Sequence, residues 1–141
     1  MNAKVDALIA YKNHIKNETE QDYNNIIHKL VDGVLRRIDR IANIENLSEE
    51  DKEQDINPEY ITFRLVDIVQ SNITYKDFNR VTFQDKIYRD VNLALREHGF
   101  CITALKVLDR EMGCSNLRLR FDVLKNVSRF SRFLHSILSI G

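Results

Sequence analysis

An uninterrupted alternation of apolar and charged residues marks the segment from residue 116 to residue 123. A period of two is typical of a β-strand that lays one face on a core and shows the other to water. We therefore expect the apolar side chains to point inward and the charged side chains to point outward. The inward set is Leu117, Leu119, Phe121 and Val123, and the outward set is Arg118, Arg120 and Asp122.

A second strand is predicted over residues 100–107, with a turn near Asp109–Gly113 between the two. Both of its faces are largely apolar, which indicates cover on both sides or an edge that another strand joins. The two segments together predict one antiparallel β-hairpin over about residues 100–123. Because an isolated two-stranded ribbon is marginal in water, helices or another chain must support it.

The residues before the hairpin have the spacing of an amphipathic helix over 83–98. Its apolar positions recur every four residues from Ile87 to Leu95, and Thr82-x-x-Asp85 is typical of a helix start. Gly99 follows at the expected end, since glycine adopts the left-handed conformation of a helix C-terminus without strain. The hairpin thus follows this helix directly.

Two further helices are predicted upstream. Asn57 and Pro58 have the pattern of an N-cap and a first helical position, which favours a helix over residues 58–71. A short helical turn is expected at 75–80 after Thr74-x-x-Asp77. Residues 46–57 are strongly acidic and hold a single large apolar side chain before Ile56, so they are interpreted as a solvated linker.

Residues 3–45 have helical periodicity throughout, with a narrow apolar stripe (Val5, Leu8, Ile9, Ile15) that precedes a broader one. Asn17-Glu18-Thr19-Glu20 matches a capping box, so two helices with a break near residues 17–19 are expected, with one long bent helix as the alternative. Gly33 within the second stripe lowers helix propensity. It is therefore expected to allow close approach of a neighbouring element.

Helical spacing returns after residue 124 and continues to the C-terminus. The apolar residues of this segment cover more than one helical face, which favours a helix placed between the core and a partner. The fold class expected is α+β and predominantly helical, a single domain over residues 1–141 with one hairpin and a C-terminal helix. The predicted interaction residues are Phe130, Phe133, Leu134, Ile137 and Leu138.

The composition indicates a globular chain whose net charge of zero hides an asymmetry. Residues 1–56 hold 8 Lys/Arg and 12 Asp/Glu, whereas residues 57–141 hold 13 and 9. No apolar run approaches the ~20 residues of a membrane span, and no signal-peptide pattern begins the chain. Two cysteines are too few for a disulfide framework. We expect a soluble intracellular protein without a membrane partner, cytoplasmic or, if of bacteriophage origin, within a virion.

Catalytic and metal-binding patterns are weak in this sequence. The four histidines are scattered, and Cys101 and Cys114 lie too far apart for a zinc pair. No glycine-rich phosphate loop of either common spacing occurs. The sequence therefore predicts a protein that is not an enzyme and that needs no cofactor or metal.

The predicted order of a helix at 58–71, a helix at 83–98 and a hairpin at 100–123 resembles the helix-turn-helix-plus-wing core of winged-helix domains. This resemblance rests on element order and implies nucleic-acid binding, with the second helix in the major groove. The zero net charge of residues 83–98 counts against strong binding of DNA phosphates. The residues that would carry it are Lys86, Arg89, Arg96, Arg118 and Arg120, beside Gln84 and Asn92.

The leading functional hypothesis is a non-enzymatic protein–protein interaction or assembly component. Its partner would be another protein or a second copy in a homo-oligomer, reached through the hairpin and residues 124–141. A richness in Asn, Ile, Lys and Asp with one proline favours a bacteriophage virion or accessory protein as the specific case. The alternative is a winged-helix-like nucleic-acid-binding regulator.

Overall fold

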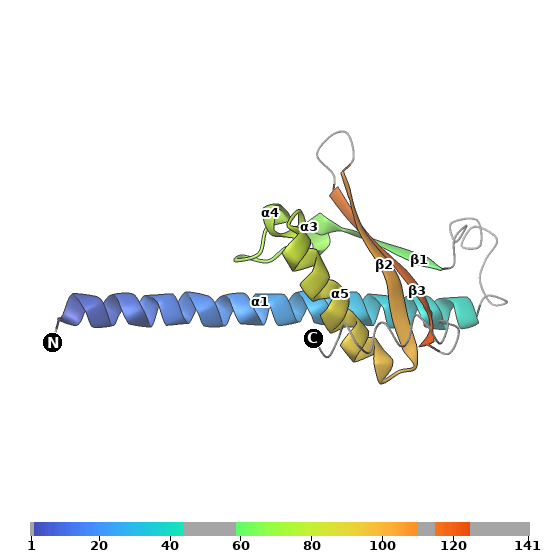
Figure 1. Ribbon diagram of the computed structural model, residues 1–141, viewed down its shortest axis with the longest axis horizontal. Helices are drawn as coiled ribbons and strands as arrows, with labels where there is room; N and C mark the ends of the chain where they lie inside the picture. The colour runs from blue at the N-terminus through green and yellow to red at the C-terminus, as the bar shows by residue number, and fades with distance from the viewer. Residues whose placement is uncertain (1, 44–58, 110–114, 125–141) are drawn as a thin grey trace.

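A computed structural model describes residues 2–43, 59–109 and 115–124. The described part is mostly helical and contains a small three-stranded antiparallel sheet (Figure 1). The predicted C-terminal helix and the acidic linker lie outside the described residues. The helices are α1 (Ala3–Ala42), α3 (Leu65–Ile68), α4 (Tyr75–Phe78) and α5 (Val81–Arg96), and the strands are β1 (Tyr60–Arg64), β2 (Phe100–Asp109) and β3 (Ser115–Val123).

Helix α1 runs without interruption through the predicted break at residues 17–19. The Asn2 side chain accepts a hydrogen bond from the Lys4 backbone N–H and caps the start. Thr19 Oγ1 donates to the Ile15 carbonyl oxygen four residues earlier, at 2.8 Å, which satisfies its hydroxyl inside the helix. The prediction of two helices is therefore wrong and the alternative of one long helix holds, because a capping-box sequence permits a helix start without requiring one, and Asn17 and Glu20 stay exposed within the continuous helix.

The two predicted strands are present as β2 and β3, but they belong to a three-stranded sheet and not to a lone hairpin. The predicted alternation of inward and outward residues holds along most of β3, whereas Asp122 and Val123 at its end are both half-buried. Leu117, Leu119 and Phe121 are buried on β3, while Arg120 between them is exposed. The cysteine at the start of β2, Cys101, pairs with Asp122. The expected support by a helix is present, because α5 packs against β2. A third strand of the same chain, which was not predicted, joins β3 and leaves β2 at the edge of the sheet.

That third strand corrects the helix predicted over residues 58–71. Tyr60–Arg64 forms β1, which pairs antiparallel with β3, so the order in the sheet is β1-β3-β2. Residues 60–63 are aromatic or β-branched and therefore suit a pleated surface. Ile61 and Phe63 pair with Leu119 and Leu117 on the inner face. The helical spacing survives only in the single turn of α3.

The junction between α5 and the sheet follows the sequence closely. Gly99 has a positive φ of 83°, as predicted for the stop after α5. Further along, β2 has a register shift between Ile102 and Ala104, and the Ile102 N–H donates to Asn92 Oδ1 on α5 at 2.7 Å. At this β-bulge the backbone of β2 is therefore hydrogen-bonded to a side chain of α5. The predicted turn after Thr74 is also present, as α4 with a complete capping box.

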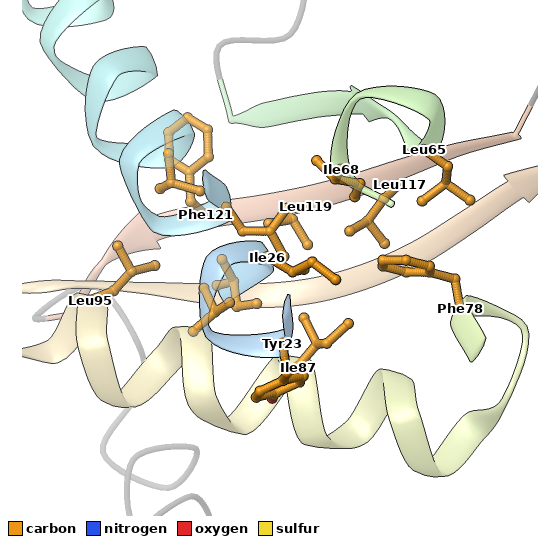
Figure 2. Close-up of a cluster of buried hydrophobic side chains, with 14 of the residues drawn as sticks. Tyr23, Ile26, Leu65, Ile68, Phe78, Ile87, Leu95, Leu117, Leu119 and Phe121 are labelled. Atoms are coloured by element: carbon orange, nitrogen blue, oxygen red, sulfur yellow. The ribbon is translucent and has the colours of Figure 1, made fainter. Parts of the chain in front are cut away.

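The core lies where α1, α5 and the inner face of the sheet meet. Figure 2 shows side chains from these elements and from α3 and α4 directed toward one another. Close approach of α1 to β1 depends on Gly33, because a Cβ there would stand 2.5 Å from Phe63 Cε1. The predicted role of this glycine is thereby confirmed. The most deeply buried residues include Ile26, Leu30, Val34, Phe78, Ile87, Val91, Leu95, Ile102, Leu117 and Leu119.

Polar contacts join α1 to the packed body near residue 23, and Lys29 Nζ donates to the Asp67 carbonyl oxygen further along the helix. Tyr23 donates its hydroxyl hydrogen to Asp90 Oδ2 on α5, and its ring meets Phe83 edge-on at 5.9 Å between centroids. One position earlier, Asp22 Oδ2 accepts from the backbone N–H of Asn72 at 2.9 Å and from its side-chain amide at 3.1 Å. These contacts mark the point from which α1 is part of the packed body.

Candidate interaction surfaces

The N-terminal end of α1 extends beyond the packed body, as Figure 1 shows. All residues from 3 to 14, here called the projecting end, are exposed. Four large apolar side chains among them lie in water, with 50% of Val5, 54% of Leu8, 52% of Ile9 and 62% of Tyr11 accessible. The sequence pattern identified the stripe, but the structure leaves it uncovered by any part of the chain that is described.

This exposed stripe continues the core-facing side of α1. Val5 and Leu8 precede Tyr23 and Ile26 by the same 18 positions, which is five turns at 3.6 residues per turn. Tyr23 and Ile26 are buried, so the face that packs in the body is the face that carries apolar residues on the projecting end. The stripe is therefore built like a packing surface rather than like a solvated helix face.

Positive and negative side chains lie in different parts of residues 3–22 of α1. Residues 3–14 hold Lys4 and Lys12 against Asp6, whereas residues 15–22 hold three acids, Glu18, Glu20 and Asp22, against Lys16. An exposed His14–Glu18 pair, with Nε2 and Oε1 2.9 Å apart, bridges the two parts. The helix thus presents a weakly cationic end followed by an anionic part.

The second surface is the outer face of the sheet, which the strand register defines. Three rows of paired residues cross the three strands there, one of which consists of Arg64, Asn116 and Leu108. Of the other two, the first row is Thr62 on β1, Arg118 on β3 and Lys106 on β2, and the second row is Tyr60, Arg120 and Ala104. Thr62, Ala104, Lys106 and Arg120 are exposed, and Tyr60 and Arg118 are half-buried.

Cations and one aromatic ring dominate these two rows. The guanidinium carbons of Arg118 and Arg120 lie 5.6 Å and 5.9 Å from the centroid of the Tyr60 ring. Arg120 also pairs with Glu59 at 3.0 Å. Neither Arg118 nor Lys106 has a carboxylate partner in the described part of the chain.

The five residues predicted for nucleic-acid binding do not form one surface. Lys86, Arg89 and Arg96 are exposed on α5, and Lys86 Nζ lies 4.1 Å from the centroid of the Tyr23 ring. Helix α5 packs on the inner side of the sheet, whereas Arg118 and Arg120 project from the outer side. The structure therefore separates the helix cations from the strand cations.

Two polar residues of α5 that sequence reasoning offered for base contacts serve the fold instead. Asn92 accepts from Ile102, and Gln84 Nε2 donates to the Phe78 carbonyl oxygen at 2.7 Å. Tyr60 was missed as a surface residue because its segment has helical spacing. Its alternating aromatic and β-branched neighbours are the signal that favours a strand. The predicted interaction residues from Phe130 to Leu138 lie outside the described residues.

Titratable groups with shifted pKa values are tied to packing in this structure. Burial, followed by the hydrogen bond with Asp90, raises the pKa of Tyr23 far above its ordinary value. Burial also raises the pKa of Tyr88 and of the free Cys101 thiol, whose Sγ lies 3.8 Å from the Asp122 carbonyl oxygen. A cysteine held as the neutral thiol is a poor nucleophile. The three raised pKa values therefore reflect burial in the core and give no sign of a reactive group.

Within residues 2–43, 59–109 and 115–124, no three histidine, cysteine or acidic residues gather closely enough to hold a metal ion. Within the same ranges no helix combines the length and apolar character that a bilayer crossing requires. The two exposed surfaces are therefore the features on which a functional argument can be built.

Comparisons with models of protein families, with curated proteins and with solved structures found no match for this chain. The projecting end and the outer sheet face are the surfaces of the described residues that suggest a function. Each is described by contacts and exposure within the chain itself.

Proposed function

We propose that this protein is a non-enzymatic assembly component that associates with a second copy of itself through the projecting end of α1. The observation that carries this proposal is the exposed stripe of Val5, Leu8 and Ile9, which continues the core-facing side of the same helix. A soluble chain gains about 1.5–3 kcal/mol from removing each such side chain from water. These three side chains at helical spacing therefore form a continuous apolar stripe that a partner helix can cover.

The stability of the projecting end supports the same conclusion. Helices shorter than about 12–15 residues are marginal in water, and tertiary packing supplies most helical stability in proteins. Residues 3–14 have no packing partner in the described part of the chain. A partner that covers the stripe would supply the packing that the body gives to the rest of α1.

The division of charge favours a second copy in antiparallel orientation. In a parallel pair, the acidic part of residues 15–22 would lie beside its own equivalent and would be repelled. In an antiparallel pair, the cationic projecting end of one copy lies beside the anionic part of the other. Such an arrangement is self-complementary and closes with two-fold symmetry, which is the commonest oligomer symmetry. Electrostatic complementarity of this kind sets orientation more than affinity.

The experiment compares the solution mass of three full-length proteins by sedimentation over a range of concentrations. The wild type is expected to reach the mass of a dimer as concentration rises. Leu8→Glu places a charge in the stripe and is expected to stay monomeric. Ala10→Glu adds the same charge on the opposite side of the same helix, and is expected to dimerise like the wild type.

Two results would contradict the proposal. One is a wild type that stays monomeric at the highest concentration reached. The other is a dimer that Leu8→Glu and Ala10→Glu affect equally, since that would place the interface elsewhere. Circular dichroism of each variant checks that the folded body is retained, because Leu8 and Ala10 make no contribution to the buried core.

A further inference from the structure

The outer face of the sheet holds an unbalanced pair of positive charges. Lys106 and Arg118 are direct cross-strand partners, and residues paired in this way have Cβ atoms about 4.5–5.5 Å apart. Like charges directly opposite each other destabilise a sheet. No carboxylate of the described residues neutralises either side chain. An anion bound between them would remove this repulsion.

Arg118 is also restrained in position. Its Nε is buried and meets no hydrogen-bond acceptor among the described residues, and its guanidinium lies 5.6 Å from the Tyr60 ring centroid. A restrained guanidinium loses less side-chain entropy when it binds an anion. Thr62, its partner on β1, is exposed and adds a hydroxyl beside it. The row across the sheet thus offers two cations and a hydrogen-bonding group.

The neighbouring row adds stacking surfaces. Tyr60 and Arg120 are direct cross-strand partners, and the Arg120 guanidinium carbon lies 5.9 Å from the Tyr60 ring centroid. Aromatic rings and guanidinium planes are the groups on which proteins stack unpaired bases. The last residue of the row is the exposed Ala104 on the edge strand β2. Its side chain is too small to block a base that stacks on Tyr60 or Arg120.

Breaking the exposed ion pairs at the border of this face costs little folding free energy. Arg120 pairs with Glu59, and the two side chains are 48% and 60% exposed. Arg64 pairs with Asp67 in a comparably exposed position. Exposed pairs of this kind contribute little to stability, so a phosphate can replace the carboxylate without a large loss. Arg120 is then available to an anionic chain together with Arg118 and Lys106.

We propose that the outer sheet face binds single-stranded nucleic acid. Tyr60 and Arg120 stack on bases, and Arg118 and Lys106 bind the phosphates that follow. A cationic surface that tracks the backbone, combined with stacking side chains, is the arrangement by which proteins hold single strands without reading their sequence. This site differs from a helix in the major groove, because it uses the sheet and not α5.

The test measures binding of a fluorescently labelled oligothymidylate, about 16 nucleotides long, by anisotropy with the full-length protein. The wild type is expected to bind at low salt, with affinity that falls as salt rises. Lys106→Glu is expected to weaken binding by about tenfold or more, because it removes one phosphate contact and repels another. The same change creates an opposite-charge pair with Arg118, so the thermal midpoint should not fall.

The matched control is Arg96→Glu on α5, which makes the same change of charge at an exposed residue on the other side of the sheet. It is expected to leave single-strand affinity within about twofold of the wild type, because it lies outside the site and acts only through screened charge. Tyr60→Leu should weaken binding by about tenfold through loss of stacking, whereas Tyr60→Phe retains the ring and should bind like the wild type.

Several results would overturn this inference. These are a wild type that does not bind the oligothymidylate at low salt, and a Lys106→Glu variant that binds as well as the wild type. Tighter binding to a duplex of the same length, lost in Arg96→Glu, would place recognition on α5 instead. Displacement of the oligonucleotide by millimolar inorganic phosphate as effectively as by unlabelled strand would reduce the site to a simple anion site.

Discussion

Leu119 shows how strongly one residue of this fold depends on its neighbours. It lies on the central strand, pairs with Ile61 on one side and Leu105 on the other, and is fully buried. We expect Leu119→Ala to lower the free energy of unfolding by about 2–4 kcal/mol, because the cut leaves a cavity that both neighbouring strands border. Chemical denaturation measures this loss.

The control for this cut is Leu93→Ala on α5, since 51% of Leu93 is exposed. It removes the same atoms from a site in water and is expected to change stability by about 0.5 kcal/mol or less. Equal losses in the two variants would contradict the inward orientation of Leu119.

Tyr23 makes stability depend on alkaline pH. Its pKa in the folded protein lies well above its ordinary value of 10.0, chiefly because of burial. The unfolded chain therefore loses this proton first, and stability falls as pH rises above about 10, by at most about 1.4 kcal/mol per pH unit for one group. Below pH 10 the contribution is fully present. Denaturation at pH 9 and at pH 11 measures the fall.

The Tyr23→Phe variant separates this effect from general alkaline unfolding. At pH 9 it is expected to be less stable than the wild type by about 1–3 kcal/mol, since Asp90 loses its buried donor. Its further loss between pH 9 and pH 11 should be smaller than that of the wild type. Tyr88, whose pKa is also raised by burial, keeps part of the dependence in both proteins.

At the scale of whole elements, the contact between α1 and β1 rests on Gly33. In an isolated helix, Gly33→Ala would add up to about 1 kcal/mol of helix propensity. Here its Cβ would stand 2.5 Å and 2.6 Å from two atoms of the packed Phe63 ring. We expect the overpacking, about 1–3 kcal/mol, to outweigh the gain, so that chemical denaturation shows a less stable protein.

The partner variant Phe63→Leu tests whether the ring is the cause. In the Gly33→Ala, Phe63→Leu double variant the shorter side chain leaves room for the new methyl group. The alanine should then stabilise relative to Phe63→Leu alone, which a double-mutant cycle measures as a coupling energy. Additive losses would mean that α1 and β1 are not in contact at this position.

Local sequence patterns predicted some elements correctly, but they failed where contacts between distant segments determine the secondary structure. The alternation on β3 and the stop at Gly99 depend only on neighbouring residues, and both were predicted correctly. Strand β1 was missed because Asn57-Pro58 has the pattern of a helix start and its apolar spacing also fits a helix. Its pairing with β3 joins residues more than 50 positions apart, which no local pattern encodes.

The candidate surfaces were predictable to a different extent. The stripe of Val5 and Leu8 is visible in the sequence, but its exposure depends on where the body of the protein ends along α1. The row of Thr62, Arg118 and Lys106 needs the order of three strands, one of which was predicted as a helix. Sequence periodicity thus identified apolar and charged faces of helices and strands. The three-dimensional structure was needed to show which of these faces no other described part of the chain covers.

At the scale of the whole molecule, the two surfaces lie on different elements. The projecting end belongs to α1 before the level of Tyr23, and the outer sheet face lies on the side of the sheet away from α1. A dimer joined through the projecting ends therefore carries two outer sheet faces that the interface does not cover. Each copy keeps its own row of Thr62, Arg118 and Lys106 accessible.

This arrangement predicts that a long single strand binds the dimer more tightly than a short strand does. Once one sheet face holds the strand, the second face meets it at a raised effective concentration, and such linkage increases affinity by about 10²–10⁴ when the strand spans both sites. Anisotropy with oligothymidylates of increasing length should show a step in wild-type affinity. Leu8→Glu should bind short strands normally and lack the step, whereas Ala10→Glu should keep it. A step that persists in monomeric Leu8→Glu would show that strand length acts within one copy, and the two surfaces would then work independently.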